Sequence, residues 1–246
     1  MAEFWKLALP LFNTPKSYED MLKKLAGFAF YEVYLLTFLL RDIEAIASGL
    51  RQLETSGAIG AWISTIPGEK TLNVAGLMLA LFVAFLSHLL PLHNRVSDLL
   101  GIRKRFDKTY ILVPLAKLVG VTLTLVQTQK LIANRHDLMQ ATFYKYASSR
   151  AKEPLVDKHD IEHALNAWSW FWVFLEATIF WSIASAIAFA FGGNGLGWSA
   201  LGVVVVAIGA AFAQYPRLKT YARREIATIA RDSDAERSVR NIFNAL

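Results

Sequence analysis

Long apolar stretches alternate along this chain with polar, mainly basic segments. A helix needs about 20 apolar residues to cross about 30 Å of hydrocarbon, and four stretches approach or exceed that length. The shortest has 16 residues and contains Glu32, whereas the longest has 25 residues and contains Glu176. The four stretches are 25–40, 72–92, 167–191 and 195–213. This pattern predicts an all-α integral membrane protein with four transmembrane helices.

The placement of Lys and Arg decides whether the shortest stretch spans. If 25–40 crosses the membrane, 23 of the 26 Lys and Arg residues lie on one side, and only Arg41, Arg51 and Lys70 lie on the other. Lys and Arg accumulate on the cytoplasmic side of membrane proteins. We therefore predict four spans in the cell inner membrane, with both termini in the cytoplasm. A fifth apolar segment, 111–126, would move much of the basic sequence outside, so we expect it at the membrane face or buried in a cytoplasmic module.

These spans divide the chain into five parts. A helix that begins at Ser17 should continue into the first span, and the apolar spacing after Leu40 predicts an amphipathic helix on the outer surface. Ser56–Lys70 has the Gly and Pro content of a loop. The expected parts are an N-terminal cytoplasmic helix (1–24), spans one and two (25–92) with an outer loop (41–71), a cytoplasmic helical region (93–166), a hairpin of spans three and four (167–213) and a basic cytoplasmic tail (214–246).

The tail itself predicts a further helix. Asp234 can cap its start. Four apolar residues then repeat at helical spacing along one face: Val239, Ile242, Phe243 and Leu246. Such a stripe must dock on a partner, on another subunit or on the membrane surface.

Composition narrows the chemistry. The chain has no Cys, which excludes disulfides, thiolate catalysis and Cys-based metal centres. Its net charge of +6 lies next to the spans, where it favours contact with anionic headgroups and not with nucleic acid. It lacks the nucleophile, phosphate-loop and serine-lysine signatures of enzymes. We therefore expect a non-enzymatic protein without a cofactor.

Two acids within the apolar stretches carry the sharpest functional signal. Glu32 lies in the middle of the first span and Glu176 inside the third, so neither is placed to reach the headgroups. A carboxylate in hydrocarbon is costly, and such residues commonly face a protein interior or a water-filled path for ions or protons. The alternative is a structural role, in which each acid is protonated or bonded to a neighbouring helix.

Small and aromatic residues mark the expected helix contacts and membrane boundaries. Small residues at helical spacing form one face of the fourth span: Gly195, Ser199, Gly202, Gly209 and Ala213. In lipid, helices associate through such faces, so this face should pack against span three, near Ser185, or against a second copy. Aromatic residues near the span ends predict an inner belt (Trp168, Trp170, Trp172 and Tyr215) and an outer belt (Trp62 and Trp198).

A basic segment follows the second span. Its four cations can bind a ligand or lipid phosphate, although topology alone also explains their presence. They are Arg103, Lys104, Arg105 and Lys108. Asp107 lies among them, and with Arg103 and Arg105 it could contact a phosphate-bearing ligand or a partner that signals to the spans.

Histidine offers a weaker possibility. His159 and His163 are four residues apart, which places both imidazoles on one helix face, as a metal site requires. Membrane-bound di-iron enzymes use such boxes but need about eight histidines, and this chain has five. We therefore predict no metal, with this pair as the weak candidate.

Four spans with a compact basic cytoplasmic module resemble, in architecture, the small membrane effectors of bacterial antiviral defence. The resemblance implies a protein that permeabilises the inner membrane when a cytoplasmic signal arrives. The leading prediction is a homo-oligomeric channel or permeability path past Glu32 and Glu176, controlled by the cytoplasmic region. The alternative is a membrane anchor or adaptor that recruits a soluble cytoplasmic partner.

Overall fold

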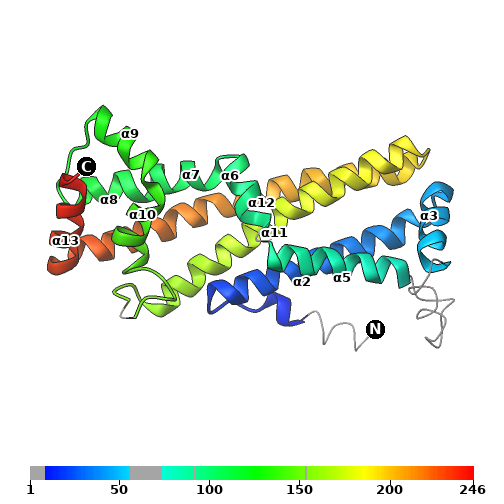
Figure 1. Ribbon diagram of the computed structural model, residues 1–246, viewed down its shortest axis with the longest axis horizontal. Coiled ribbons are helices and arrows are strands. Elements are labelled where there is room, and N and C mark those ends of the chain that lie inside the picture. The colour runs from blue at the N-terminus through cyan, green and yellow to red at the C-terminus, as the bar shows by residue number, and fades with distance from the viewer. Residues whose placement is uncertain (1–8, 56–73, 91, 153) are drawn as a thin grey trace. The chain divides into compact units, whose positions relative to one another are not determined.

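The computed structural model describes residues 9–55, 74–90, 92–152 and 154–246, and these residues form helices and connecting turns without a strand. The prediction of an all-helical protein is confirmed. The chain folds into two compact units (Figure 1). Unit 1 comprises Met1–Phe12, Leu22–Leu92 and Trp170–Phe212, and unit 2 comprises Asn13–Met21, His93–Ser169 and Ala213–Leu246.

The described part of unit 1 consists of helices and turns. The elements that contribute to it are η1 (Leu9–Phe12), α2 (Tyr18–Leu40), α3 (Glu44–Thr55), α5 (Val74–Leu89), α11 (Lys158–Ala190) and α12 (Asn194–Arg231). As predicted, α2 begins after Ser17, whose hydroxyl accepts from the Asp20 backbone N–H at 3.1 Å, and runs unbroken to Leu40. The amphipathic helix expected after Leu40 is α3, whereas the predicted loop 56–70 and Trp62 lie outside the described residues.

Helices α11 and α12 form the predicted hairpin, and their joint is tighter than expected. Gly192 has φ +82°, a left-handed conformation that glycine adopts without strain, and the Gly193 N–H donates to the Ala188 carbonyl at 2.7 Å. Helix α12 then starts at Asn194, so most of the glycine-rich segment is helical. Gly193 also lies against Ile43, where a Cβ atom would come within 2.9 Å of Cδ1.

The Gly193 contact places the end of α2 and the α11–α12 turn at the same end of unit 1, as Figure 1 shows. A buried cluster joins α2 to α11 there, made of Leu36, Leu40, Ala184 and Ala188. At the opposite end of the predicted spans, Phe12 and Phe28 pack on Trp170, with ring centroids 5.8 and 5.3 Å from that indole. Helices α2 and α11 therefore run in the same direction, opposite to α5 and α12 (Figure 1).

Two helices are long and apolar enough to cross a membrane, α11 and α12. A third is added if α5 and the following helix are counted as one broken span. Helix α5 has 16 residues, fewer than the 21 predicted; it ends at Leu89, and Leu90 lies in a turn. The coarse prediction of a membrane protein is supported, and the structure gives two or three candidate spans among the described residues.

Unit 2 has a conventional buried core. Its further helices are α6 (Leu92–Leu99), α7 (Ile102–Phe106), η2 (Asp107–Leu112), α8 (Val113–Leu118), α9 (Leu125–Ala133), α10 (Arg135–Met139), η3 (Gln140–Tyr144) and α13 (Ser233–Asn244). The apolar segment 111–126 supplies much of this core, since Leu112, Leu115 and Val119 are fully buried. Of the two placements predicted for this segment, burial within a helical module is the one observed.

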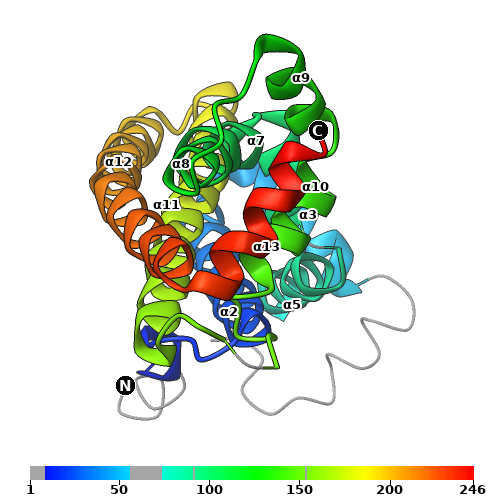
Figure 2. The same cartoon turned by 90° about the vertical axis from the view of Figure 1, so that its left-hand side faces the viewer.

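The apolar stripe of α13 is buried against other helices of the same chain. Val239 and Phe243 are completely buried, and α13 packs on η3 and α8 (red in Figure 2). The Arg240 side chain donates to the Val119 carbonyl at 2.7 Å, at the end of α8. The expectation that this stripe needs another molecule is therefore wrong, because the chain supplies the covering surface. The cap is also Asp232 and not Asp234: its carboxylate accepts from the Asp234 and Ala235 backbone N–H groups.

Candidate functional site

The two acids predicted within the hydrocarbon both lie in unit 1, on separate helices. Glu32 lies in α2 and Glu176 in α11, and the two carboxyl groups are close enough to act on each other electrostatically. In each, the Oε2 atom is buried and has no hydrogen-bond partner among the described residues. Leaving a buried polar atom unpaired costs about 1–3 kcal/mol. The pair is therefore an unfavourable element of the fold taken alone, which points to a role beyond packing.

The chemistry open to this pair is limited. Two neighbouring carboxylates repel each other, and one proton or one cation between them removes the repulsion. In the part of the chain that the structure describes, no group of three or more His, Asp or Glu residues could hold a metal ion. The two acids alone would hold a cation weakly.

The small-residue face of α12 does not pack within the chain. Gly195, Ser199, Gly202, Gly209 and Ala213 are all exposed, and a Cβ atom at any of these three glycines would meet nothing within 4 Å. The buried side of α12 is instead formed by Ala200, Val204, Ala207 and Ala211. The span-three contact is made by Ser185, whose hydroxyl donates to the Gly197 carbonyl at 2.9 Å. The expected packing of the small face on span three is wrong, and contact with a second copy stays a prediction.

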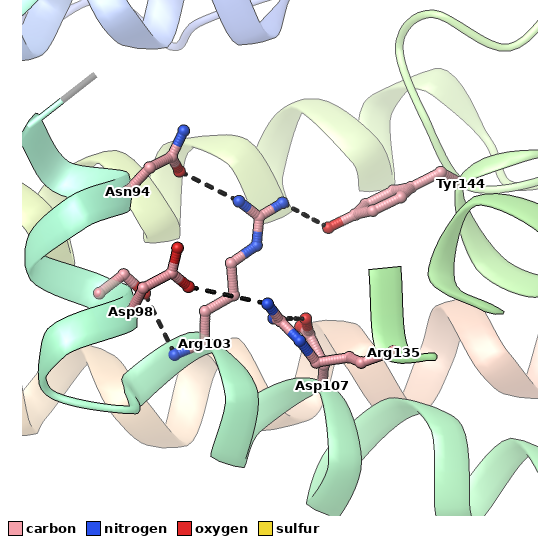
Figure 3. Close-up of polar contacts among 7 residues, drawn as sticks. Asn94, Asp98, Arg103, Asp107, Arg135 and Tyr144 are labelled. Carbon is pink, nitrogen blue, oxygen red and sulfur yellow. Dashed lines mark hydrogen bonds and ion pairs between the residues drawn. The ribbon is translucent and has the colours of Figure 1, made fainter. Parts of the chain in front are cut away.

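In unit 2 a polar network surrounds Arg103 (Figure 3). Its guanidinium donates to Asn94 Oδ1 at 3.0 Å and to the Tyr144 hydroxyl at 2.9 Å, and its backbone N–H donates to the Ser97 hydroxyl at 3.2 Å. Arg103 thus joins α6, α7 and η3. Burial is the largest influence on Tyr144 and raises the pKa of its hydroxyl, despite the opposing effect of Arg103.

A second arginine completes the network. Arg135 pairs with Asp107 at 2.7 Å and more loosely with Asp98 at 3.7 Å. Asp107 is buried, which raises its carboxyl pKa, and Arg103 and Arg135 act against that rise. Asp107 opens the π-helix η2, and Tyr144 closes the π-helix η3. π-Helices are rare and recur at functional sites.

The first turn of α2 is tied to the same network. The Tyr18 hydroxyl lies 2.9 Å from His93 Nε2 and accepts from Asn94 Nδ2 at 3.2 Å, so its own proton is available to the imidazole. Burial, and then the charge of Arg103, lower the pKa of His93 to about 4. His93 is therefore neutral at pH 7, and the Tyr18–His93 contact is a hydrogen bond between two neutral groups.

The predicted phosphate-binding cations are separated by this arrangement. Arg103 and Asp107 are bonded within the protein, Lys104 and Arg105 are exposed, and Lys108 is half-buried. Of the three residues expected to contact a phosphate-bearing ligand, Arg105 alone keeps an outward-facing position.

The histidine pair is formed as predicted. His159 Nε2 and His163 Nε2 lie 2.8 Å apart on α11, and the His163 ring stacks on Tyr221 of α12. The pair offers two ligands, against the three or four protein ligands of a zinc site. Nearby, Glu225 of α12 is buried, and burial followed by the charge of Asp160 raises its carboxyl pKa to about 8.

Sequence comparison assigns the chain to a family. The model of the YmfE protein family matches residues 17–245. The chain belongs to the YmfE protein family. A relative from Escherichia coli (strain K12), "Uncharacterized protein YmfE", is 28% identical over 179 residues, which cover 73% of this chain and 72% of the relative. No solved structure matches the chain. The YmfE match begins at Ser17, the residue that starts α2, and includes both acids and the whole Arg103 network.

Several site residues carry no signal in the sequence. No sequence motif pairs Arg103 with Asn94, Arg135 or Tyr144, although all three lie within 41 residues of it. Their meeting depends on two π-helices, which hydrophobic periodicity does not reveal. Asp107, by contrast, was named from the sequence, because it is an acid among the cations that follow the second predicted span.

Proposed function

We propose that the chain is a non-enzymatic inner-membrane protein whose helices form a gated channel or permeability path for protons or small cations. The proposal includes four spans, α2, α5, α11 and α12, with both termini in the cytoplasm, and assembly into a homo-oligomer. The single observation that carries it is the electrostatic interaction of Glu32 with Glu176, each with an unpartnered buried oxygen.

The surface of unit 1 supports the membrane setting. Large apolar side chains face outward along its helices, with Phe82 58%, Phe85 59% and Phe212 73% exposed. In water such a surface would cause aggregation, whereas in a bilayer it is solvated by acyl chains. Helix α2 has 23 residues, about 35 Å at 1.5 Å per residue, and reaches the thickness of the hydrocarbon only with its polar first turns included.

The alternating helix directions support the topology. Because Ile43 and Gly193 meet, the end of α2 and the α11–α12 turn belong on one side of the membrane. Labelling of single introduced cysteines tests this topology, because the wild-type chain contains no cysteine. Asp42→Cys and Asn194→Cys should react with an impermeant maleimide from outside intact cells, and Lys104→Cys and Arg237→Cys only after permeabilisation. Equal labelling of all four before permeabilisation would contradict four spans.

Ion flux tests the function directly. The purified full chain is reconstituted into liposomes, and proton and potassium fluxes are compared for wild type, Glu32→Gln, Glu176→Gln and the control Asp42→Asn. Asp42 is an exposed acid of unit 1, outside the predicted hydrocarbon. We expect either Gln variant to change flux severalfold and the control to match wild type.

The outcomes separate the two roles of the acids. Flux that all three variants leave unchanged would assign Glu32 and Glu176 to packing. Absence of flux in correctly inserted wild type would favour the adaptor alternative. Plating of phage on cells with and without the gene would test the antiviral role that the architecture predicts.

The adaptor alternative has its own observation. In unit 2, apolar side chains at the start of α9 face outward, with Leu125 85% and Val126 62% exposed. A soluble partner that covered them would bind unit 2, and the spans of the chain would hold that partner at the membrane. A stoichiometric protein that co-purifies with the wild type and is lost in Leu125→Ser would favour this function.

A further inference from the structure

A group of positively charged and phenolic side chains lies where α7 and η2 meet α12, within unit 2. Lys219 Nζ lies 5.0 Å from the ring centroid of Tyr110 and 4.6 Å from that of Tyr215. The Tyr110 and Tyr215 rings pack edge to face, with their centroids 5.9 Å apart. Arg105 is close enough to act electrostatically on both phenols. These four residues are called the tyrosine–cation cluster below.

The charges of this cluster are uncompensated. Among the described residues, neither Arg105 nor Lys219 forms an ion pair with a carboxylate. The cluster therefore presents two positive charges and two hydroxyl groups, which together recognise a phosphate oxygen. This differs from Arg103 and Arg135, whose guanidinium groups are bonded to protein acceptors.

The nearby positive charges affect the pKa of the Tyr110 hydroxyl. Lys219 has the largest influence on Tyr110 and lowers its pKa, and Tyr215 and Arg105 act in the same direction. Tyr215 shows the opposite shift, because burial and the neighbouring Tyr110 raise its pKa. A field that favours negative charge on the Tyr110 oxygen also favours a bound anion at that position.

The position of the cluster points to a lipid source. Tyr215 follows the last residue of the predicted fourth span, Ala213, by two positions, and Trp168 is the second residue of the predicted third span. Both belong to the predicted inner aromatic belt, which marks headgroup depth. Phe106 packs on both rings, with centroids 4.7 Å from Trp168 and 6.1 Å from Tyr215. The cluster thus lies beside aromatic residues that belong at the membrane interface.

We propose that Arg105, Tyr110, Tyr215 and Lys219 bind the phosphate of an anionic phospholipid headgroup. The site revises the sequence prediction, because it keeps Arg105 of the basic segment and replaces its neighbours with residues from η2 and α12. It does not depend on ion conduction, and flux and lipid binding are measured separately.

Native mass spectrometry of the full chain in non-ionic detergent tests the site. Bound phosphatidylglycerol and phosphatidylcholine are counted for wild type, Arg105→Ala/Lys219→Ala and the matched control Lys117→Ala/Arg217→Ala. The control also removes two exposed cations of unit 2, from α8 and from the side of α12 away from Lys219. We expect the cluster variant to lose about tenfold or more in phosphatidylglycerol affinity, and the control to stay within about twofold.

A milder variant keeps the test decisive if the charge variant does not fold. Tyr110→Phe/Tyr215→Phe retains both rings and removes both hydroxyl groups, and it should lose about threefold to tenfold in phosphatidylglycerol affinity. The site would be wrong if the cluster and control variants lost phosphatidylglycerol affinity equally. It would also be wrong if the Phe variant and the charge variant both bound this lipid as well as wild type. Excess inorganic phosphate is the remaining arm: if it displaces the lipid fully from wild type, the site recognises free phosphate and the lipid assignment is wrong.

Discussion

Units 1 and 2 treat their apolar residues in opposite ways. Unit 1 turns large side chains outward, such as Val206 at 71% and Phe212 at 73% exposure, and buries small ones such as Ala188 and Ala200 between helices. Unit 2 has a core of fully buried large residues such as Leu112, Leu131 and Phe243, and exposes others, such as Leu125, at helix ends. The same preference for an apolar environment explains both, because one unit suits a bilayer and the other suits water.

Their buried polar groups differ in the same sense. In unit 2, Arg103, Asp107 and Arg135 are each bonded to protein partners. In unit 1, Glu32 and Glu176 each retain an unpartnered oxygen. The bonded groups around Arg103 therefore stabilise unit 2. The two acids of unit 1 are instead candidates for a function that lowers stability.

The largest expected difference comes from removing one aromatic ring in each unit. Phe243→Ala should destabilise unit 2 by about 3–5 kcal/mol, because it empties a fully buried site under α13. Phe212→Ala should change stability by less than about 0.5 kcal/mol, since its ring is already exposed. Thermal unfolding of the full chain in detergent measures both. Equal losses would show that the outward face of unit 1 is covered in the folded protein.

Breaking the Arg135 ion pair should cost somewhat less. Arg135→Ala leaves Asp107 buried without its main partner and should destabilise unit 2 by about 2–3 kcal/mol, below the full range because Arg135 is 20% exposed. Asp98→Ala is the control, because its contact is 3.7 Å long and its carboxylate is 64% exposed. Limited proteolysis of unit 2 should accelerate only in Arg135→Ala. Equal protection of both variants would contradict a structural role for the pair.

Glu225 gives unit 2 a pH dependence that Glu225→Gln should remove. Its folded pKa of about 8 exceeds the unfolded value of about 4.3, so the folded chain binds the extra proton and loses stability as pH rises from about 4 to about 8. At pH 6 the variant should be more stable than wild type by roughly 2 kcal/mol, because wild type has by then lost about 1.4 kcal/mol per pH unit above about 4.3. Melting curves across this pH range check the slope. Parallel curves for the two proteins would place the proton elsewhere.

The smallest effect is expected for Glu176→Gln in unit 1. The substitution removes an electrostatic repulsion with Glu32 and breaks no hydrogen bond of the buried Oε2 atom. Stability should therefore stay within about 0.5 kcal/mol of wild type or rise slightly, although ion flux changes. A loss above about 1 kcal/mol would show that Glu176 stabilises unit 1 as a hydrogen-bond partner.

Hydrophobic patterning predicted the regular parts of this fold. The start of α2 at Ser17, the hairpin of α11 and α12 and the burial of 111–126 follow from periodicity, capping and glycine placement. The covering of the α13 stripe by α8 and η3 did not follow, because an amphipathic face shows that something must cover it but not what.

The candidate sites divide in the same way. Glu32 and Glu176 were identifiable because an acid within hydrocarbon is costly wherever its neighbours lie. Their electrostatic interaction needed the structure, as did the links of Arg103 to Tyr144 and of Lys219 to Tyr110, because these residues belong to separate helices. The outward orientation of Gly195 and Gly202 was missed because a small-residue face looks the same whether it meets its own chain or another.

The π-helix η2 has a consequence for insertions and deletions. An α-helix closes its hydrogen bonds over four residues and a π-helix over five, so η2 amounts to an α-helix with one residue added. Deleting one residue between 108 and 111 should restore a continuous α-helix from α7 to α8 and leave the buried side of α8 facing inward. The same deletion within α8 would turn every later residue by about 100° and expose the core. Unit 2 thus contains one place where the length of the chain can change while its packing is retained.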